Sequence, residues 1–248
     1  MATDAGMLQA VPEQGKSLPR ISPTQTRPAF WEAQLWQQSI TAPLERRALA
    51  WLATRMPAWV NSDHLTLLGF AAMILAGASY ALARWNGAGL LLATVCLALN
   101  WFGDSLDGTL ARLRNRQRPR YGFYVDHVID TIGGLFLMGG LAVSGYVDWR
   151  IALGMYIGFL MLSVETYLAA YATGTFRLSC AKLGPTEIRI LLALGNMALW
   201  IDPGARVAGT PYRLLDAGGV AAIAGIMAMM VFLTVRHTAQ LYREETLP

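Results

Sequence analysis

Four aspartates lie close together in two short stretches of an otherwise apolar sequence. Asp104 and Asp107 are three residues apart, and Asp126 and Asp130 are four residues apart. If both stretches are helical, each spacing puts its two carboxylates on one face of its helix. Ionised carboxylates at membrane depth are costly and usually mark a functional site. Four converging carboxylates need a cation, and oxygen ligands suit Mg²⁺, Mn²⁺ or Ca²⁺. Phosphoryl transfer with two metal ions is the chemistry that most needs such a cluster.

Two glycines and an arginine complete the pattern. Residues Asp104 to Arg112 read Asp-Ser-Leu-Asp-Gly-Thr-Leu-Ala-Arg, and residues Gly122 to Asp130 read Gly-Phe-Tyr-Val-Asp-His-Val-Ile-Asp. This pattern resembles the signature of the CDP-alcohol phosphotransferases, in which these acids, glycines and arginine are the fixed residues. Every fixed residue is present, with one extra residue between Arg112 and Gly122. A weaker similarity covers 61–66, where a serine stands in place of the proline that is usual in the family.

The resemblance implies a reaction and a role for each residue of the motif. A substituted phosphoryl group would pass from a CDP-alcohol to an acceptor alcohol, with release of CMP, in phospholipid synthesis. The four aspartates would bind two ions of Mg²⁺ or Mn²⁺, and Asp130 would also be the general base for the attacking hydroxyl. The CDP part would be held by Asp63, Thr66, Gly108 and Arg112.

Two sets of residues are candidates for the second substrate, and they favour different branches of the family. The charged cluster at the start of the fifth apolar segment is typical of an anion site, and it consists of Arg177, Lys182, Glu187 and Arg189. It favours CDP-diacylglycerol as donor to a soluble polyol or phospho-alcohol. Glu165 and Tyr171 suit an aminoalcohol, and His127 after Asp126 resembles the Asp-His pair of choline and ethanolamine enzymes. These favour CDP-choline or CDP-ethanolamine as donor to a lipid alcohol, and the sequence leaves both branches open.

The composition is that of a polytopic membrane protein, because 54% of the 248 residues are hydrophobic and 15% are charged. Windows long enough to span a membrane, about 20 residues each, occur six times, at 64–83, 88–111, 122–146, 151–173, 186–202 and 214–235. With the N-terminus in the cytoplasm, four of the 20 Lys and Arg residues fall outside, namely Arg84, Arg150, Arg206 and Arg213. The positive-inside rule favours this orientation. It places the acidic motif at the cytoplasmic face, and a bacterial inner membrane is the expected location.

The predicted fold is all-α, a polytopic bundle of six transmembrane helices preceded by an interfacial amphipathic helix. Residues 1–28 are predicted to be a flexible cytoplasmic tail, residues 29–60 the interfacial helix, and residues 61–248 the transmembrane catalytic domain. Cys96 and Cys180 fall at different depths, so no disulfide is expected. The net charge of +4 is a topology and lipid-headgroup signal, and no nucleic-acid-binding motif accompanies it.

A divalent cation transporter is the alternative from a different class, because four intramembrane acids suit an ion path. Transport would prefer acids near the bilayer midplane, whereas these lie at one cytoplasmic edge beside an arginine that repels cations. The sequence therefore favours an enzyme. Its expected partners are a CDP-alcohol, an acceptor alcohol and membrane lipid, and a homodimer is left open.

Overall fold

Seven α-helices make up the part of the chain that the structure describes, a computed structural model covering residues 42–173, 185–205 and 213–245. They are α1 (Ala42–Arg55), α2 (Ser62–Ala83), α3 (Ala88–Leu113), α4 (Pro119–Val143), α5 (Trp149–Thr173), α6 (Pro185–Ile201) and α7 (Leu214–Glu244). The all-α prediction is confirmed. The predicted tail 1–28, the first part of the interfacial helix, and the candidates Arg177, Lys182 and Cys180 lie outside the described residues.

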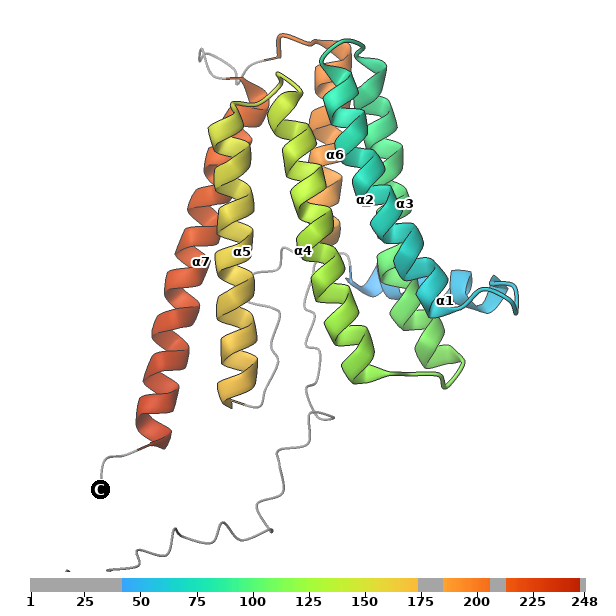
Figure 1. The fold of residues 1–248 in the computed structure, drawn as a ribbon, viewed down its shortest axis with the longest axis vertical. Coiled ribbons are helices and arrows are strands. Elements are labelled where there is room, and N and C mark those ends of the chain that lie inside the picture. The colour runs from blue at the N-terminus through green and yellow to red at the C-terminus, as the bar shows by residue number, and fades with distance from the viewer. Residues whose placement is uncertain (1–41, 174–184, 206–212, 246–248) are drawn as a thin grey trace, which may run out of the picture.

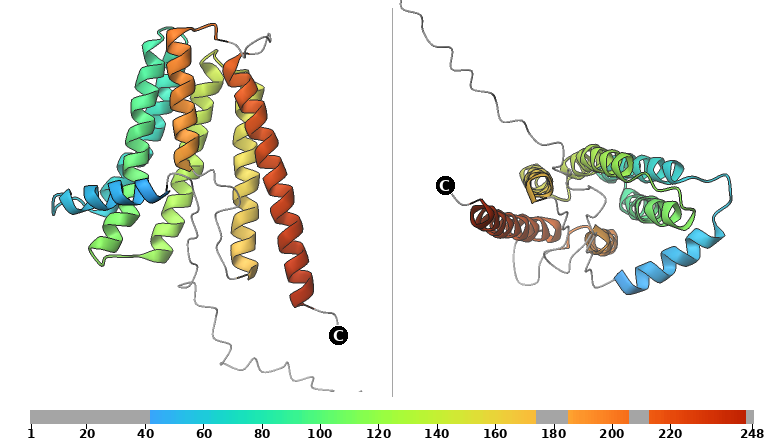
Figure 2. Two further views of the ribbon diagram at one scale, coloured as in Figure 1. Left: turned by 180° about the vertical axis from the view of Figure 1, so that it is seen from behind. Right: turned by 90° about the horizontal axis from the view of Figure 1, so that it is seen from below.

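Helices α2 to α7 run alternately up and down, and α1 lies across the lower part of the bundle (Figures 1 and 2). Helix α1 buries Leu49 and Ala53 against Leu106 and Leu110 of α3, and it exposes Trp51 to the outside. This is the arrangement expected of an interfacial helix. The helix ends at Arg55 and not at residue 60 as predicted, because a residue that precedes proline, here Met56, is disfavoured in the helical conformation.

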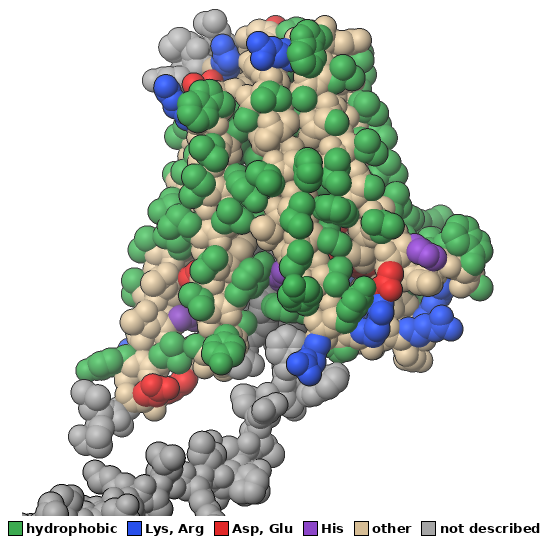
Figure 3. All heavy atoms as spheres, viewed as in Figure 1, with side chains coloured by type: hydrophobic (Ala, Val, Ile, Leu, Met, Phe, Trp, Pro, Cys, Tyr) green, Lys and Arg blue, Asp and Glu red, His purple; other side chains and the backbone are tan. Residues whose placement is uncertain are grey.

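Among the described residues, five helices are long and apolar enough to cross a membrane, namely α2, α3, α4, α5 and α7. The protein is therefore an integral membrane protein, and hydrophobic side chains are spread over the middle of the face shown in Figure 3. The predicted fifth span, 186–202, corresponds to α6, which has 17 residues. It is about 25 Å long, somewhat less than the hydrocarbon thickness of about 30 Å. Helix α3 continues without a break through the acidic motif to Leu113.

Helix α2 packs against both α3 and α4, and glycines set the distance between the backbones. A Cβ atom added to Gly140 on α4 would lie 1.9 Å from the carbonyl oxygen of Gly77 on α2. A Cβ atom added to Gly103 on α3 would lie 2.5 Å from the carbonyl oxygen of Leu65 on α2. Helices in membranes approach closely where small residues face each other. The two crossings hold α3 and α4 on the same helix, and therefore fix the two halves of the acidic motif relative to each other.

Helix α6 is joined to the upper half of this core by buried polar side chains. The Tyr80 hydroxyl donates to Oδ1 of Asn196 at 3.0 Å, and Nδ2 of Asn196 donates to the Thr94 hydroxyl at 3.1 Å. Asn196 and Tyr80 are both fully buried. These interhelical hydrogen bonds fix the position of α6 against α2 and α3.

We predict that Gly140→Ala destabilises the protein, whereas Gly139→Ala does not. The methyl group introduced at position 140 would overlap backbone atoms of α2, and overpacking of this kind costs about 1–3 kcal/mol. Gly139 is the matched control, because a Cβ atom there meets nothing within 4 Å. Thermal unfolding of the purified variants in detergent measures the difference. Equal unfolding midpoints for the two variants would contradict the close crossing of α2 and α4.

Candidate active site

The four predicted aspartates form one cluster near the lower end of the bundle. Asp104 and Asp107 lie on α3, Asp126 and Asp130 lie on α4, and both helices pack on α2. The charges of Asp104, Asp107 and Asp130 all act on Asp126. The Asp130 side chain is exposed, and the other three are half-buried. The fold therefore places carboxylates from both halves of the motif near one another.

Asp104 is paired with an arginine from a distant part of the chain. Nη2 of Arg189, on the second turn of α6, lies 2.6 Å from Oδ2 of Asp104, and both side chains are largely shielded from solvent. Sequence reasoning placed Arg189 near the second substrate but did not pair it with Asp104. The arginines of the motif region have other partners. Arg112 donates to the Thr109 hydroxyl at 3.2 Å, and Arg114 donates to the backbone carbonyls that follow α1.

Two side chains at the start of α2 donate hydrogen bonds to Asp107. The Thr66 hydroxyl donates to Oδ2 of Asp107 at 2.6 Å, and the backbone N–H of Gly108 donates to Oδ1. The Ser62 hydroxyl donates to the backbone carbonyl of Asp107 at 3.1 Å. Two of the four predicted nucleotide-binding residues, Thr66 and Gly108, therefore contact the same carboxylate.

The other two predicted nucleotide-binding residues are Arg112 and Asp63. A Cβ atom added to Gly108 would lie 3.4 Å from Nη1 of Arg112, so the guanidinium lies beside this glycine. Asp63 forms an ion pair with Arg118 on the outer side, and this contact raises the pKa of the Arg118 guanidinium. Asp63 and Arg118 also line a cavity of about 400 Å³ between the start of α2 and the end of α3.

Glu165 faces away from the acidic cluster. Its Oε1 lies 2.7 Å from Nδ1 of His237 on α7, and the two residues line a cavity of about 130 Å³. Tyr171, the predicted companion of Glu165, is 93% exposed.

His127 lies on the side of α4 that meets α5. Its ring packs on Phe123, with ring centroids 4.1 Å apart, and against Tyr167, with centroids 5.0 Å apart. Its Nδ1 is 2.6 Å from the carbonyl oxygen of Phe123. The fourth residue of the predicted second-substrate cluster, Glu187, is buried near the start of α6.

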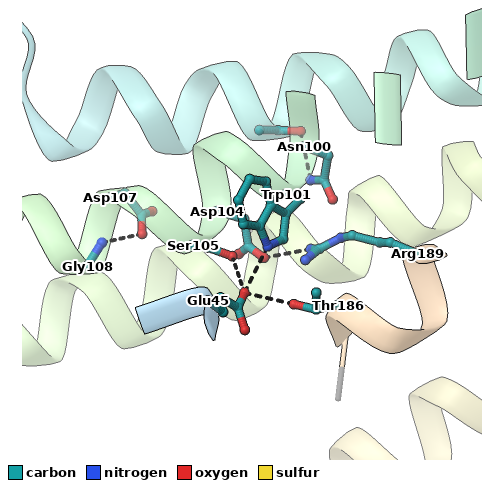
Figure 4. Close-up of polar contacts among 10 residues, drawn as sticks. Glu45, Asn100, Trp101, Asp104, Ser105, Asp107, Gly108, Thr186 and Arg189 are labelled. Carbon is teal, nitrogen blue, oxygen red and sulfur yellow. Dashed lines mark hydrogen bonds and ion pairs between the residues drawn. The ribbon is translucent and has the colours of Figure 1, made fainter. Parts of the chain in front are cut away.

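Sequence reasoning missed one residue of this region altogether. Glu45 of α1 accepts hydrogen bonds from Trp101 and Ser105, which flank Asp104, and from Thr186 at the start of α6 (Figure 4). Glu45 stands alone in an amphipathic stretch, so no motif or spacing pointed to it. The structure thus extends the site to an element that precedes the acidic motif by almost 60 residues.

The chemistry of the acidic cluster fits a hard divalent cation, because all its donors are carboxylate oxygens that repel one another. No side-chain hydrogen bond or ion pair joins Asp126 or Asp130 to another described residue. As the side chains stand, no three acidic, histidine or cysteine residues in the described ranges lie close enough to share one ion. Arg189 holds one oxygen of Asp104, and Thr66 holds one oxygen of Asp107. The donor set is therefore suited to a cation, without forming a closed coordination sphere.

These features are those of an integral membrane protein with an acidic region near one end of a helical bundle. The sequence model of the CDP-alcohol phosphatidyltransferases matches residues 59–236, which include all four aspartates. The chain belongs to the CDP-alcohol phosphatidyltransferase family, and its activity is that of a CDP-alcohol phosphotransferase in phospholipid synthesis. The family depends on divalent metal, in agreement with the donor set. Membership also favours the enzyme over the cation transporter.

Curated relatives include members with different substrates in their names. The chain is 31% identical over 157 residues to the archaetidylinositol phosphate synthase of Pyrococcus horikoshii, covering 62% of this chain and 77% of the relative. It is 29% identical over 161 residues to that of Methanothermobacter thermautotrophicus, covering 63% and 75%. It is 27% identical over 170 residues to human cholinephosphotransferase 1, covering 60% of this chain but 40% of that protein.

Proposed function

We propose that this enzyme transfers a lipid-bearing phosphoryl group from a CDP-linked lipid to a phosphorylated alcohol and releases CMP. The observation that carries the proposal is the ion pair between Arg189 and Asp104, 2.6 Å apart. It brings a cation to the edge of the acidic cluster, where an anionic acceptor needs one. The similarity to two archaetidylinositol phosphate synthases supports an acceptor of this kind.

The residues that would serve an aminoalcohol are less well placed. Glu165 is engaged with His237 on the side of α5 that faces α7, whereas Tyr167 of the same helix faces His127 on α4. An ammonium group bound at Glu165 would therefore lie on the far side of α5 from the aspartates. This separation favours the phosphorylated acceptor over CDP-choline or CDP-ethanolamine as donor.

On the donor side, the CDP part is proposed to bind at the start of α2 and the end of α3. Thr66 and Gly108 fix the Asp107 carboxylate, Arg112 would bind the pyrophosphate, and Asp63 at the cavity of about 400 Å³ would contact the nucleoside. The basic side chains along the same cavity, Arg114, Arg116 and Arg118, give it the charge that an anionic nucleotide requires.

The four aspartates are proposed to hold two ions of Mg²⁺ or Mn²⁺, which when bound stabilise negative charge on the phosphoryl oxygens and acidify the attacking hydroxyl. Asp130 is proposed to accept the proton of that hydroxyl. The acceptor oxygen forms the new bond to the lipid-bearing phosphorus, the bond from this phosphorus to CMP breaks, and CMP leaves with the electron pair. Arg189 and Arg112 orient the two substrates, so that positioning and electrostatics supply most of the rate.

The proposed membrane topology has six passes, with the site and both ends of the chain in the cytoplasm. Helix α5 ends at the lower end of the bundle and α7 begins at the upper end, and α6 lies alongside α3 in the middle and upper part of the bundle (Figure 1). Although α6 is short, it carries the chain back across the bundle. The basic residues around 112–120 then face the cytoplasm, as the positive-inside rule requires. We place the enzyme in a bacterial inner membrane and keep the homodimer as its candidate assembly.

A test of the reaction uses purified enzyme with two pairs of substrates, and identifies products by mass spectrometry. We expect a phosphorylated lipid product and CMP from CDP-diacylglycerol with a phosphorylated polyol, in the presence of Mg²⁺. Asp126→Asn should lower the rate by more than about 10³-fold, because it removes a metal ligand. Asp202→Asn, at the opposite end of the bundle, is the control and should be nearly as active as the wild type. Product from CDP-choline and diacylglycerol alone would contradict the proposal.

Arg189→Ala should raise the KM of the phosphorylated acceptor by about 10- to 100-fold, the weight of a charged hydrogen bond of about 1.5–3 kcal/mol. The KM of the CDP-linked donor should change little, because the donor is proposed to bind at the start of α2 and the end of α3, where Arg189 has no hydrogen bond or ion pair with a described residue. Steady-state kinetics with each substrate varied in turn measures both constants. Arg189→Lys, which keeps the charge, should recover part of the affinity. An unchanged acceptor KM in Arg189→Ala would remove Arg189 from the acceptor pocket.

A further inference from the structure

One carboxylate oxygen joins three helices beside the acidic cluster. Oε1 of Glu45 on α1 accepts a hydrogen bond from Nε1 of Trp101 at 2.8 Å and one from the Ser105 hydroxyl at 3.3 Å, both on α3. It accepts a third from the Thr186 hydroxyl at 2.9 Å, at the start of α6. Glu45 is half-buried, so its charge is held by these donors in a partly dry environment, where such bonds are strong.

The donors to Glu45 are next to the two residues of the ion pair. Ser105 directly follows Asp104, and Trp101 lies three residues before it, so both flank this carboxylate on α3. Thr186 lies three residues before Arg189, about one turn of α6. The contacts therefore close a ring that runs from Glu45 to α3, from Asp104 to Arg189, and along α6 back to Glu45 (Figure 4).

The position of the Arg189 side chain depends on where the first turn of α6 lies. The Asn196 contact with α2 and α3 is seven residues further along α6, about 10 Å away along the helix axis. A helix fixed at that distance can still pivot at its first turn. The Thr186 bond to Glu45 acts at that turn, on the side of the acidic cluster.

We propose that Glu45 is a positioning residue, through which α1 holds Arg189 and Asp104 in the geometry that receives the phosphorylated acceptor. The inference rests on the proposed function of Arg189. Glu45 precedes residues 59–236, which the family's sequence model matches, so the interfacial helix adds a part to the site that the shared motif does not contain. The helix that lies across the bundle then serves acceptor binding as well as anchoring.

The experiment compares the KM of acceptor and donor in a set of single variants. Glu45→Ala and Thr186→Val should each raise the acceptor KM about tenfold through loss of positioning, with the donor KM unchanged within about twofold. Glu45→Gln keeps an acceptor oxygen for the same donors, so it should lie between Glu45→Ala and the wild type. Arg47→Gln, an exposed position on the same helix, is the control and should match the wild type.

A double variant tests whether Glu45 acts through Arg189. Glu45→Ala combined with Arg189→Ala should raise the acceptor KM no further than Arg189→Ala alone, because residues that act on one contact are not additive. Additive effects, or equal rises in both KM values, would show a merely structural role and overturn the inference. The inference would also be overturned if Glu45→Ala and Glu45→Gln had the acceptor KM of the wild type while Arg189→Ala had a raised one. The proposed function of Arg189 would stand in that case. An unchanged acceptor KM in Arg189→Ala would instead contradict the proposed function, and this inference with it.

Discussion

Negative charge gathered at the edge of a membrane has to be balanced, and the site of this enzyme is organised around that requirement. Four carboxylates of α3 and α4 act on one another electrostatically. Within the described residues, Arg189 of α6 is the arginine that pairs with one of them, whereas Arg112 and Arg114 bind neutral oxygens. Divalent ions, on which the family depends, would complete the balance. In the proposed site, Arg189 and Thr66 hold two of these carboxylates in place.

The helical bundle provides this arrangement through close backbone contacts rather than through long side chains. Gly140 and Gly103 let α4 and α3 approach α2 at two levels. The two halves of the motif lie near each other because α3 and α4 both pack on α2. Buried hydrogen bonds of Asn196 attach α6 to this unit. Arg189 therefore lies on a helix that is distant in sequence from the motif, and the contact of Thr186 with Glu45 acts on the first turn of that helix.

The motif and the class of the fold could be predicted from sequence because they depend on local spacing. Carboxylates three and four residues apart define helix faces, and apolar windows define spans, without knowledge of the tertiary structure. Contacts between helices could not be predicted in this way. The pairing of Arg189 with Asp104, the bond from Thr66 to Asp107 and the pairing of Glu165 with His237 join residues 41 to 85 positions apart. They depend on how each helix is rotated, which no periodicity in this sequence specifies.

The boundaries of the elements show the same limit. Pro57 explains why α1 ends at Arg55, and Pro119 begins α4 three residues earlier than the glycine of the motif suggested, since proline suits the first turn of a helix. The effect of these prolines on the helix ends can be recognised once the structure is known, but the apolar pattern alone pointed to other residues. Glu45 is the extreme case, because a single glutamate on an amphipathic helix looks like any solvated charge.

We propose that the aspartates of α3 and α4 hold the divalent ions, and electron paramagnetic resonance can test this by counting the Mn²⁺ ions that the protein binds. Purified enzyme would be titrated with Mn²⁺ in the presence of CMP, alongside Asp104→Asn and Asp126→Asn. We expect two ions per chain in the wild type, and loss of at least one of them in each variant. Undiminished Mn²⁺ binding in both variants would contradict it, because the ions would then be bound elsewhere in the protein.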